Sequence, residues 1–491
     1  MEIPARRVAG LVPALSNALL AIALLTTLPG CSDESRADSE GTTTATLDPA
    51  FSTTHFAGAG TCTACHDNVP AGDGDLDFVA DWSGTMMAHA AHDPLWQAKV
   101  ASETARSPAM ADAIEAKCAR CHTPMAHTEN GLQDQDTRLL ADSGGVLAPD
   151  HPLHNAAMQG VSCTLCHQIR DDGLDGPESR SGRYIIADDR GTARSLFGPI
   201  EAPLTRPMQR QVGFTPTHGA HMQTSELCAT CHNLKTTVLE PATGQPVEPG
   251  QEFPEQQVYT EWAHSDFADG GAAARSCQQC HMPTLEGENP VTNRPPRAGA
   301  HAGVSRHAFV GGNTYMLALL RANREALGLT ASEAALTNAL NRTETQLKEE
   351  TAELSISDVN SADGLAFDIT VTNLTGHKLP TSFPSRRLWL HVRILDGNGN
   401  TLWESGAPRA DGRITGADGD DESASGEYEP HLDRITAEHQ IAIWEPIMET
   451  HAGDVTRTLM HAADYAKDNR IPPRGMGPSS PGDWSHLPAE I

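Results

Sequence analysis

The sequence predicts a mainly helical and irregular domain built around bound non-protein groups, followed by helices and a C-terminal β-sandwich-like domain. Three observations predict this class. Aromatic residues make up only 4% and apolar residues 38% of the 491 residues, which is little for a side-chain core in so long a chain. Ten of the eleven cysteines repeat one short motif between residues 62 and 280. Beyond residue 313 the apolar pattern becomes helical, and beyond about residue 352 it has period two.

The N-terminus is typical of an export signal. Arg6 and Arg7 precede the apolar run VAGLVPALSNALLAIALLTTL, which ends in LPGC at Cys31. This stretch resembles the lipobox of a bacterial lipoprotein, so residues 1–30 are predicted to be removed and Cys31 to be lipidated. The alternative is an uncleaved membrane anchor. Residues 31–50 are polar and aperiodic, which predicts a flexible tether.

Residues 51–312 contain two cysteines, two residues apart and followed by histidine, five times over. The cysteines are Cys62, Cys65, Cys118, Cys121, Cys163, Cys166, Cys228, Cys231, Cys277 and Cys280, and the histidines are His66, His122, His167, His232 and His281. In a c-type attachment site the two thiols add to one haem and the histidine is the proximal iron ligand. Zinc sites, redox disulfides and structural bridges also use paired cysteines, but none of them requires the histidine. The repeats therefore predict five covalent haem c groups, and these flat apolar groups would replace an aromatic core.

The sixth ligand of each iron decides between an electron carrier and a catalyst. Eleven further histidines lie between residues 55 and 307, so the residue types permit six-coordinate iron at every haem. The candidates are His307, His221, His377, His154 and Met87. The alternatives are a hydrogen-bonded surface histidine, core packing for Met87 and a turn residue for His377.

Residues 313–350 carry apolar side chains at helical spacing, which predicts two helices or one broken helix, with a threonine N-cap signal before SEAALTNAL. Residues 351–491 alternate in LAFDITVTN and RRLWLHVRIL, separated by turns such as DGNGN. This pattern predicts the β-sandwich-like domain.

Several motifs resemble those of the bacterial multihaem cytochromes c with a cytochrome c-552/c-554-type haem domain. They are GVSCTLCH, SELCATCHN, YTEWAHSDF, SRHAFVGGNTYML and VTNLTGHKLPTSFPSRRLWLHV. The resemblance spans residues 55 to 475 and implies a pentahaem lipoprotein, with His307 and His221 as axial ligands. No motif ends in lysine, which departs from the pentahaem ammonia-forming nitrite reductases. Similar proteins continue beyond WSHLPAEI, so we expect an incomplete C-terminal domain or an open-edged last sheet.

The charge and motifs together favour electron transfer through five haems in a respiratory or extracellular chain. One alternative is an oxidoreductase that acts on small nitrogen or sulfur compounds at one open-coordinated haem. Another is a homo-oligomeric conductive filament. A net charge of −29 argues against nucleic acid as a partner and favours positively charged redox proteins. The lipid anchor would hold the protein on the periplasmic or cell-surface side of a bacterial membrane.

Overall fold

The computed structural model describes residues 52–72, 75–362, 364–417, 419 and 427–477. The predicted signal peptide, Cys31 and the tether lie outside the described residues. All described residues fall within one unit, Ala45–Ile491. None of its described helices is long and apolar enough to cross a membrane.

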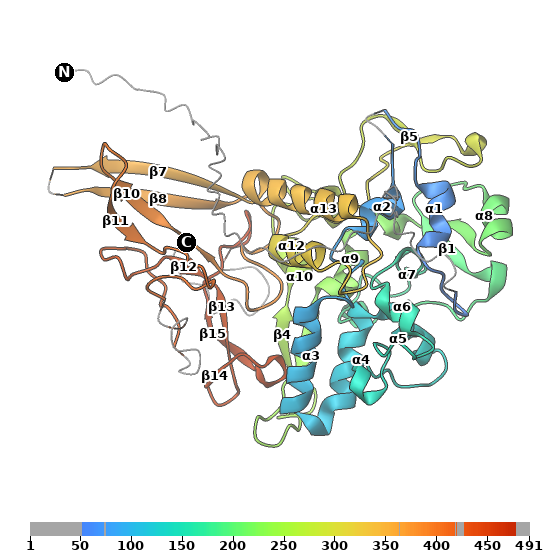
Figure 1. Ribbon diagram of the computed structural model, residues 1–491, viewed down its shortest axis with the longest axis horizontal. Helices are drawn as coiled ribbons and strands as arrows, with labels where there is room; N and C mark the ends of the chain where they lie inside the picture. The colour runs from blue at the N-terminus through green and yellow to red at the C-terminus, as the bar shows by residue number, and fades with distance from the viewer. Residues whose placement is uncertain (1–51, 73–74, 363, 418, 420–426, 478–491) are drawn as a thin grey trace, which may run out of the picture. The chain divides into compact units, whose positions relative to one another are not determined.

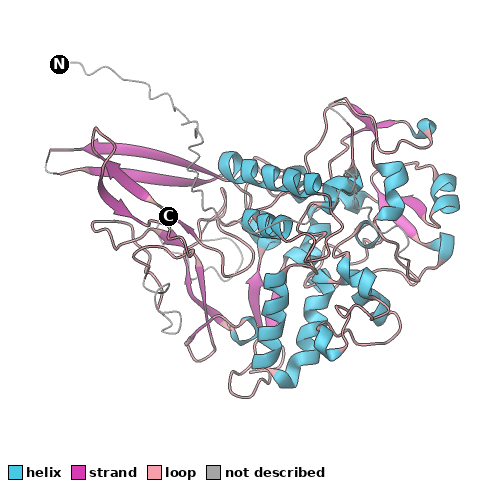
Figure 2. Cartoon of the chain, in the orientation of Figure 1, coloured by secondary structure: helices cyan, strands magenta, loops and turns pink. Residues whose placement is uncertain are grey.

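Short helices carry the N-terminal part of the chain, as the motif spacing predicted (Figures 1 and 2). The α-helices are α1 Gly60–His66, α2 Phe78–Ser83, α3 Pro94–Arg106, α4 Ala111–His122, α5 Pro124–Gly131, α6 His154–Met158, α7 Cys163–Cys166, α8 Thr205–Gln211, α9 Ser225–His232, α10 Val258–Ala263 and α11 Cys277–His281. Their 3-10 turns are η1 Pro108–Met110, η2 Ala141–Ser143, η3 Pro177–Ser179, η4 Gly191–Ala193, η5 Ala220–Gln223 and η6 Pro296–Ala298.

Three small two-stranded sheets connect these helices. Parallel β1 Ser195–Gly198 and β2 Thr215–His218 form the first, and antiparallel β3 Leu234–Thr237 and β4 Glu252–Gln256 form the second. The third pairs β5 Glu288–Pro290 with β6 Ala300–Ala302, so that Asn289 faces His301.

The helical segment after residue 313 is two helices, α12 Thr314–Ala322 and α13 Glu333–Thr345, and a π-helical turn, η7 Gln346–Glu350. The predicted threonine N-cap is wrong: Ser332 caps α13, and its hydroxyl accepts a hydrogen bond from the Ala335 amide (3.1 Å). α13 packs closely on the end of α2, because a Cβ on Gly84 would lie 2.3 Å from the Ala335 carbonyl oxygen.

The C-terminal residues form strands, but the expected β-sandwich is not confirmed. The elements are β7 Ala352–Asn360, β8 Ala366–Asn373, β9 Leu388–Trp389, β10 Val392–Leu395, β11 Thr401–Ser405, β12 Ile443–Trp444, β13 Pro446–Glu449, β14 Val455–Thr456, η8 Leu459–His461 and β15 Asp464–Asp468. They pair as β7–β8, β10–β11, β9–β12 and β14–β13–β15. In Figure 1 the β7–β8 ribbon extends from the end of α13. The strands therefore form separate small sheets among the described residues.

Buried apolar side chains form several separate clusters. One cluster includes Phe56, Met125, Leu139 and Leu165, whereas another gathers Phe253, Met448 and Tyr465 around β4, β13 and β15. A domain of this size ordinarily has one contiguous core. The division of the side-chain core agrees with the low aromatic content and leaves space between the clusters.

A buried charge cluster joins the C-terminal strands to α10. It consists of Glu261, Lys378, Asp468 and Arg470. Asp468 accepts hydrogen bonds from Lys378 Nζ (2.6 Å) and from Arg470 Nε (2.8 Å). Glu261 accepts one from the Lys378 backbone amide (3.0 Å), and its other oxygen lies 3.4 Å from Arg470 Nη1. The charge cluster therefore fixes the loop around residues 377–381 on α10.

Removing one member of the charge cluster should destabilise the protein strongly. Asp468→Asn leaves two buried cations without their shared carboxylate, so we expect a loss of about 3–5 kcal/mol in the free energy of unfolding. Burial opposes ionisation, but Arg470 and Lys378 hold the pKa of Asp468 well below its ordinary value. The stabilisation should thus be full above about pH 4 and decline as the pH falls further.

Guanidinium denaturation of the haem-loaded protein measures this loss. The matched control is Glu404→Gln, because Glu404 pairs with His391 and Arg393 on the exposed β10–β11 hairpin. That substitution should cost no more than about 1 kcal/mol. Equal losses for the two variants would contradict the role of the charge cluster.

Candidate haem sites

Each cysteine motif lies on a short helix or at a helix end. The motif histidine is the last residue of α1, α4, α9 and α11, and it directly follows α7. With 3.6 residues per turn, cysteines three positions apart fall on one side of a helix, and the next residue lies beside them. The local sequence thus presents two thiols and one imidazole together, as covalent haem attachment requires.

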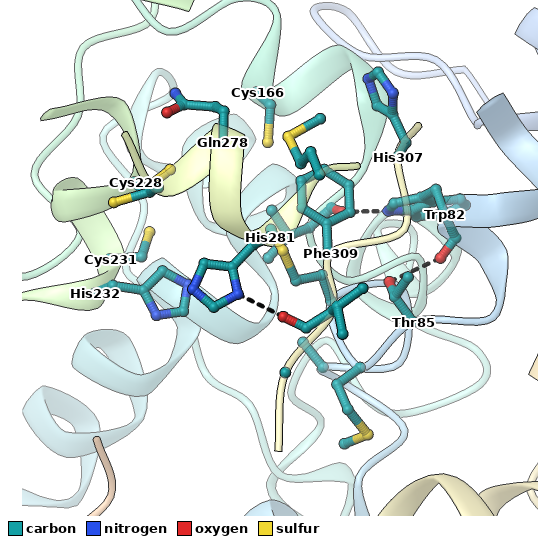
Figure 3. A pocket seen from close by; sticks show the side chains of 18 of the residues that line it. Trp82, Thr85, Cys166, Cys228, Cys231, His232, Gln278, His281, His307 and Phe309 are labelled. Carbon is teal, nitrogen blue, oxygen red and sulfur yellow. Dashed lines mark hydrogen bonds between the residues drawn. The ribbon is translucent and has the colours of Figure 1, made fainter. Parts of the chain in front are cut away.

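The motifs face one continuous cavity of about 3890 Å³. A single small-molecule or cofactor site measures about 300–1,000 Å³, so this space is large enough for several such groups. All five motif histidines line it, and so do nine of the ten motif cysteines, Cys280 being the exception. Figure 3 shows part of this cavity, into which Cys166, Cys228, Cys231, His232, His281 and His307 point.

Backbone carbonyls orient four of the motif histidines. The Nδ1 atoms of His66, His122, His167 and His281 lie 2.6–3.2 Å from the carbonyl oxygens of Val291, Ala90, Phe197 and Val310. This contact fixes Nδ1 as the protonated nitrogen and leaves the lone pair of Nε2 for a metal. Burial lowers the pKa of His122 and of His232 to about 4, so both rings are neutral at pH 7. A neutral imidazole is the metal-binding form.

Burial affects the motif thiols strongly. It raises the pKa of Cys118 and of Cys166 to about 12, so neither is a reactive thiolate. The ten motif cysteines form no disulfide. In the part of the chain that the structure describes, no group of three or more His, Cys, Asp or Glu side chains could hold a metal ion. Desolvated thiols beside neutral imidazoles fit the haem-attachment interpretation of the motifs.

Contacts between thiols of different motifs show which sites are neighbours. Cys62 lies within hydrogen-bonding reach of Cys163, so the first and third sites are neighbours. Cys121 and Cys231 likewise join the second and fourth sites.

Cys228 and Cys277 likewise join the fourth site to the fifth. These contacts group the first site with the third, and the second and fifth sites with the fourth.

Gly160 precedes the third motif and lets the chain pass close to the segment that contains Met87 and Ala90. Its φ is +54°, and a Cβ there would lie 2.5 Å from the Met87 carbonyl oxygen. Only glycine fits this close approach without strain. Because Ala90 of the same segment orients His122, Gly160 brings elements of two sites together.

Two sequence-predicted ligands lie opposite motif histidines. The ring centroids of His167 and His307 are 6.2 Å apart with planes at 15°, and those of His281 and His377 are 6.3 Å apart with planes at 11°. A bond between a metal and a histidine nitrogen is about 2.0–2.1 Å long, and the centroid of the imidazole ring lies roughly 1.1 Å behind that nitrogen. Two imidazole rings that bind one metal from opposite sides therefore have centroids about 6.3 Å apart. Both spacings fit this arrangement. Burial lowers the pKa of His307 to about 4, so it is neutral as well.

The other three candidates have different surroundings. Met87 lines the cavity, whereas His221 and His154 do not. His221 is buried, with Nε2 bound to the Ile169 carbonyl oxygen (2.9 Å) and its ring against Phe197. His154 places Nδ1 3.3 Å from the Val146 carbonyl oxygen. Ligation by any of the five stays a prediction.

Fewer histidines reach the cavity than the sequence supplies. Besides the five motif histidines, three others among the described residues line it: His301, His307 and His377. His301 lies on the β5–β6 hairpin, next to the Val291 carbonyl that orients His66, and the sequence analysis did not single it out. Its surroundings in AGAHAGV carry no recognisable signal.

Comparisons with known proteins gave one family match and one similar structure. Residues 61–168, which hold the first three motifs, match the model of the family described as cytochrome c554 and c-prime. The chain is also similar to a penta-heme cytochrome c552 from Thermochromatium tepidum, with 18% identity, a TM-score of 0.47 and coverage of 81% of this chain and 82% of that one. No curated protein matches the chain. The family match covers less than half of the chain, and over that segment it agrees with the haem-attachment interpretation of the first three motifs.

Proposed function

We propose that this multihaem cytochrome c binds five haems and transfers electrons through them between redox proteins. Haem c supplies reversible one-electron chemistry. The chain itself holds the ligands in place, excludes water from them and sets the local charge. The shared cavity carries this proposal, because all five motif histidines line it.

The side chains suit a relay with little rearrangement. The carbonyls of Phe197 and Val310 fix the rings of His167 and His281, and the opposing rings of His307 and His377 lie nearly parallel to them. The charge cluster holds the loop that carries His377. A site that changes little between its oxidised and reduced states favours fast electron transfer.

Location and partners follow from parts of the sequence that the structure does not describe. We infer that a lipid on Cys31 anchors the chain to a bacterial membrane on the periplasmic or cell-surface side. The formal charge of −29 would steer positively charged redox proteins toward it.

Mass spectrometry and a redox titration of the exported protein test the proposal. We expect the mass of five added haem groups and reduction of all the haem by a low-potential donor. A mass without added haem, or with zinc in its place, would refute haem attachment. Full haem content in a protein that cannot pass electrons between donor and acceptor proteins would refute the relay.

The positions of the opposing rings favour a second candidate function. Among the described residues, His307 and His377 face motif histidines at the third and fifth sites, and we infer that one of the other three irons lacks a protein sixth ligand. An open iron could reduce a small nitrogen or sulfur compound. Electron paramagnetic resonance distinguishes the two functions: a high-spin signal that changes on adding nitrite or hydroxylamine indicates the enzyme, and low-spin signals alone indicate the carrier.

A further inference from the structure

Arg386 is an arginine in the cavity wall with no charge partner. Its Nη2 donates to the Asn313 side-chain oxygen (2.7 Å), which is neutral. None of the described Asp or Glu side chains forms an ion pair with Arg386. Desolvation lowers the pKa of Arg386, and no carboxylate offsets it. A desolvated guanidinium without a counter-ion is costly, which suggests that a bound anion completes this site.

The other basic side chains of the cavity wall have other surroundings. Lys99 pairs with Glu103 (2.7 Å), and Glu255 and Glu252 lie near Lys117. Arg210, Arg294, Arg297 and Arg457 are exposed to solvent. The Arg387 guanidinium lies over the Trp389 ring, 6.0 Å from its centroid. Two arginines outside the wall are also satisfied, since Arg180 stacks on Tyr259 and Arg194 on Phe214.

The surroundings of Arg386 suit an anion. Asn313 is the N-cap of α12, and its side chain does not cap the helix because it binds Arg386. Asn313, Thr314 and Tyr315 line the same cavity, so the positive end of the α12 dipole adds to the charge of the guanidinium. A Cβ on Gly312 would lie 3.8 Å from Arg386 Nη1, and the carbonyl of nearby Val310 orients His281, which places Arg386 near the fifth haem site.

We propose that Arg386, held by Asn313 at the start of α12, binds one carboxylate or small oxyanion in the cavity beside the fifth haem site. This inference rests on the proposed haem content. The anion has two possible sources with one chemistry: a haem propionate, or a free oxyanion such as nitrite. In either case the planar guanidinium offers two parallel N–H donors that match the two oxygens.

The test compares wild type with Arg386→Gln and Arg386→Lys in the haem-loaded protein. The control is Arg138→Gln, which removes the same charge from an exposed pair with Asp112. Haem content is measured first by the pyridine haemochrome assay. A wild-type protein without haem would refute the proposed function, and this outcome is thereby separated from failure of the inference about Arg386. Spectroelectrochemical titrations at several pH values and nitrite titrations followed by absorbance are then compared.

Each source predicts a distinct result. If a propionate is the anion, Arg386→Gln changes the pH dependence of the midpoint potential of one centre, because loss of the guanidinium raises the pKa of the carboxylate. If a free oxyanion is bound, Arg386→Gln raises the Kd for nitrite at least about tenfold and leaves the pH dependence unchanged. Arg386→Lys should show the same change in the potential or in the Kd, to a smaller degree. If Arg386→Gln loses haem, Arg386→Lys is measured in its place. Variants that match Arg138→Gln in both titrations would overturn the proposal.

Discussion

A chain produced without haem is expected to remain unfolded. The cavity of about 3890 Å³ lies between the separate side-chain clusters, and none of these clusters is a core for the whole unit. An unfilled cavity costs about 24 cal/mol per Å³ where the surroundings cannot collapse, so a tenth of this volume left empty would cost about 9 kcal/mol. That matches the whole stability of a typical domain, about 5–15 kcal/mol. We therefore expect the haem groups to contribute to folding as well as to function.

Circular dichroism and limited proteolysis of cytoplasmically expressed, haem-free chain measure this effect. The control is the same sequence exported in a host with haem-attachment enzymes. We expect a cooperative thermal transition and protection from protease in the exported protein alone. A haem-free chain that unfolds cooperatively with native-like helix content would show that side chains suffice, and would refute the structural role of the cofactors.

Replacing His307 by alanine should convert one low-spin centre to high spin. Its ring lies 6.2 Å from that of His167 and nearly parallel to it, inside the cavity wall. Among the described residues no other histidine forms a ring pair with His167. The third site would then lack this imidazole, while the side chains at the other sites stay unchanged. Electron paramagnetic resonance should show one new high-spin signal per molecule and an equal loss of low-spin intensity.

Two further variants make this assignment specific. His221→Ala removes a histidine that is also buried and close to His167, but its Nε2 is bound to the Ile169 carbonyl, so the spin states should not change. His307→Met should keep the centre low-spin and raise its potential, because methionine is a weaker donor to ferric iron. An unchanged spectrum for His307→Ala, or a high-spin signal for His221→Ala, would contradict the assignment.

The charge cluster suggests how the C-terminal part affects the haem sites. His377 belongs to a loop held by Glu261 of α10, through the Lys378 amide and the Thr381 hydroxyl. Asn373 also donates to the His377 carbonyl oxygen (2.8 Å). The strands thus position a residue that faces the fifth site, so they contribute to the haem region as well as to stability.

The sequence by itself determined the features that depend on neighbouring residues. Covalent attachment needs Cys-x-x-Cys-His within one turn of helix, so the motifs predict the thiols and proximal histidines without knowledge of the fold. The helices after residue 313 were equally predictable, because their apolar spacing and polar starts are local. The strands of residues 351–491 were predicted from alternation alone, but their partners were not. β9, for example, pairs with β12 across two intervening strands.

Only the tertiary structure decided which site adjoins which, which histidines reach the cavity and which charges lie beside them. His167 and His307, His281 and His377, and Glu261 and Lys378 are all far apart in the chain. Their encounter depends on how helices and loops pack around the cavity, and no local pattern encodes that. His221 and His307 look equally suitable in the sequence, yet a backbone carbonyl occupies the Nε2 of one while the other faces a motif histidine. An imidazole can serve a metal, a hydrogen bond or packing, and the surrounding structure selects among these uses.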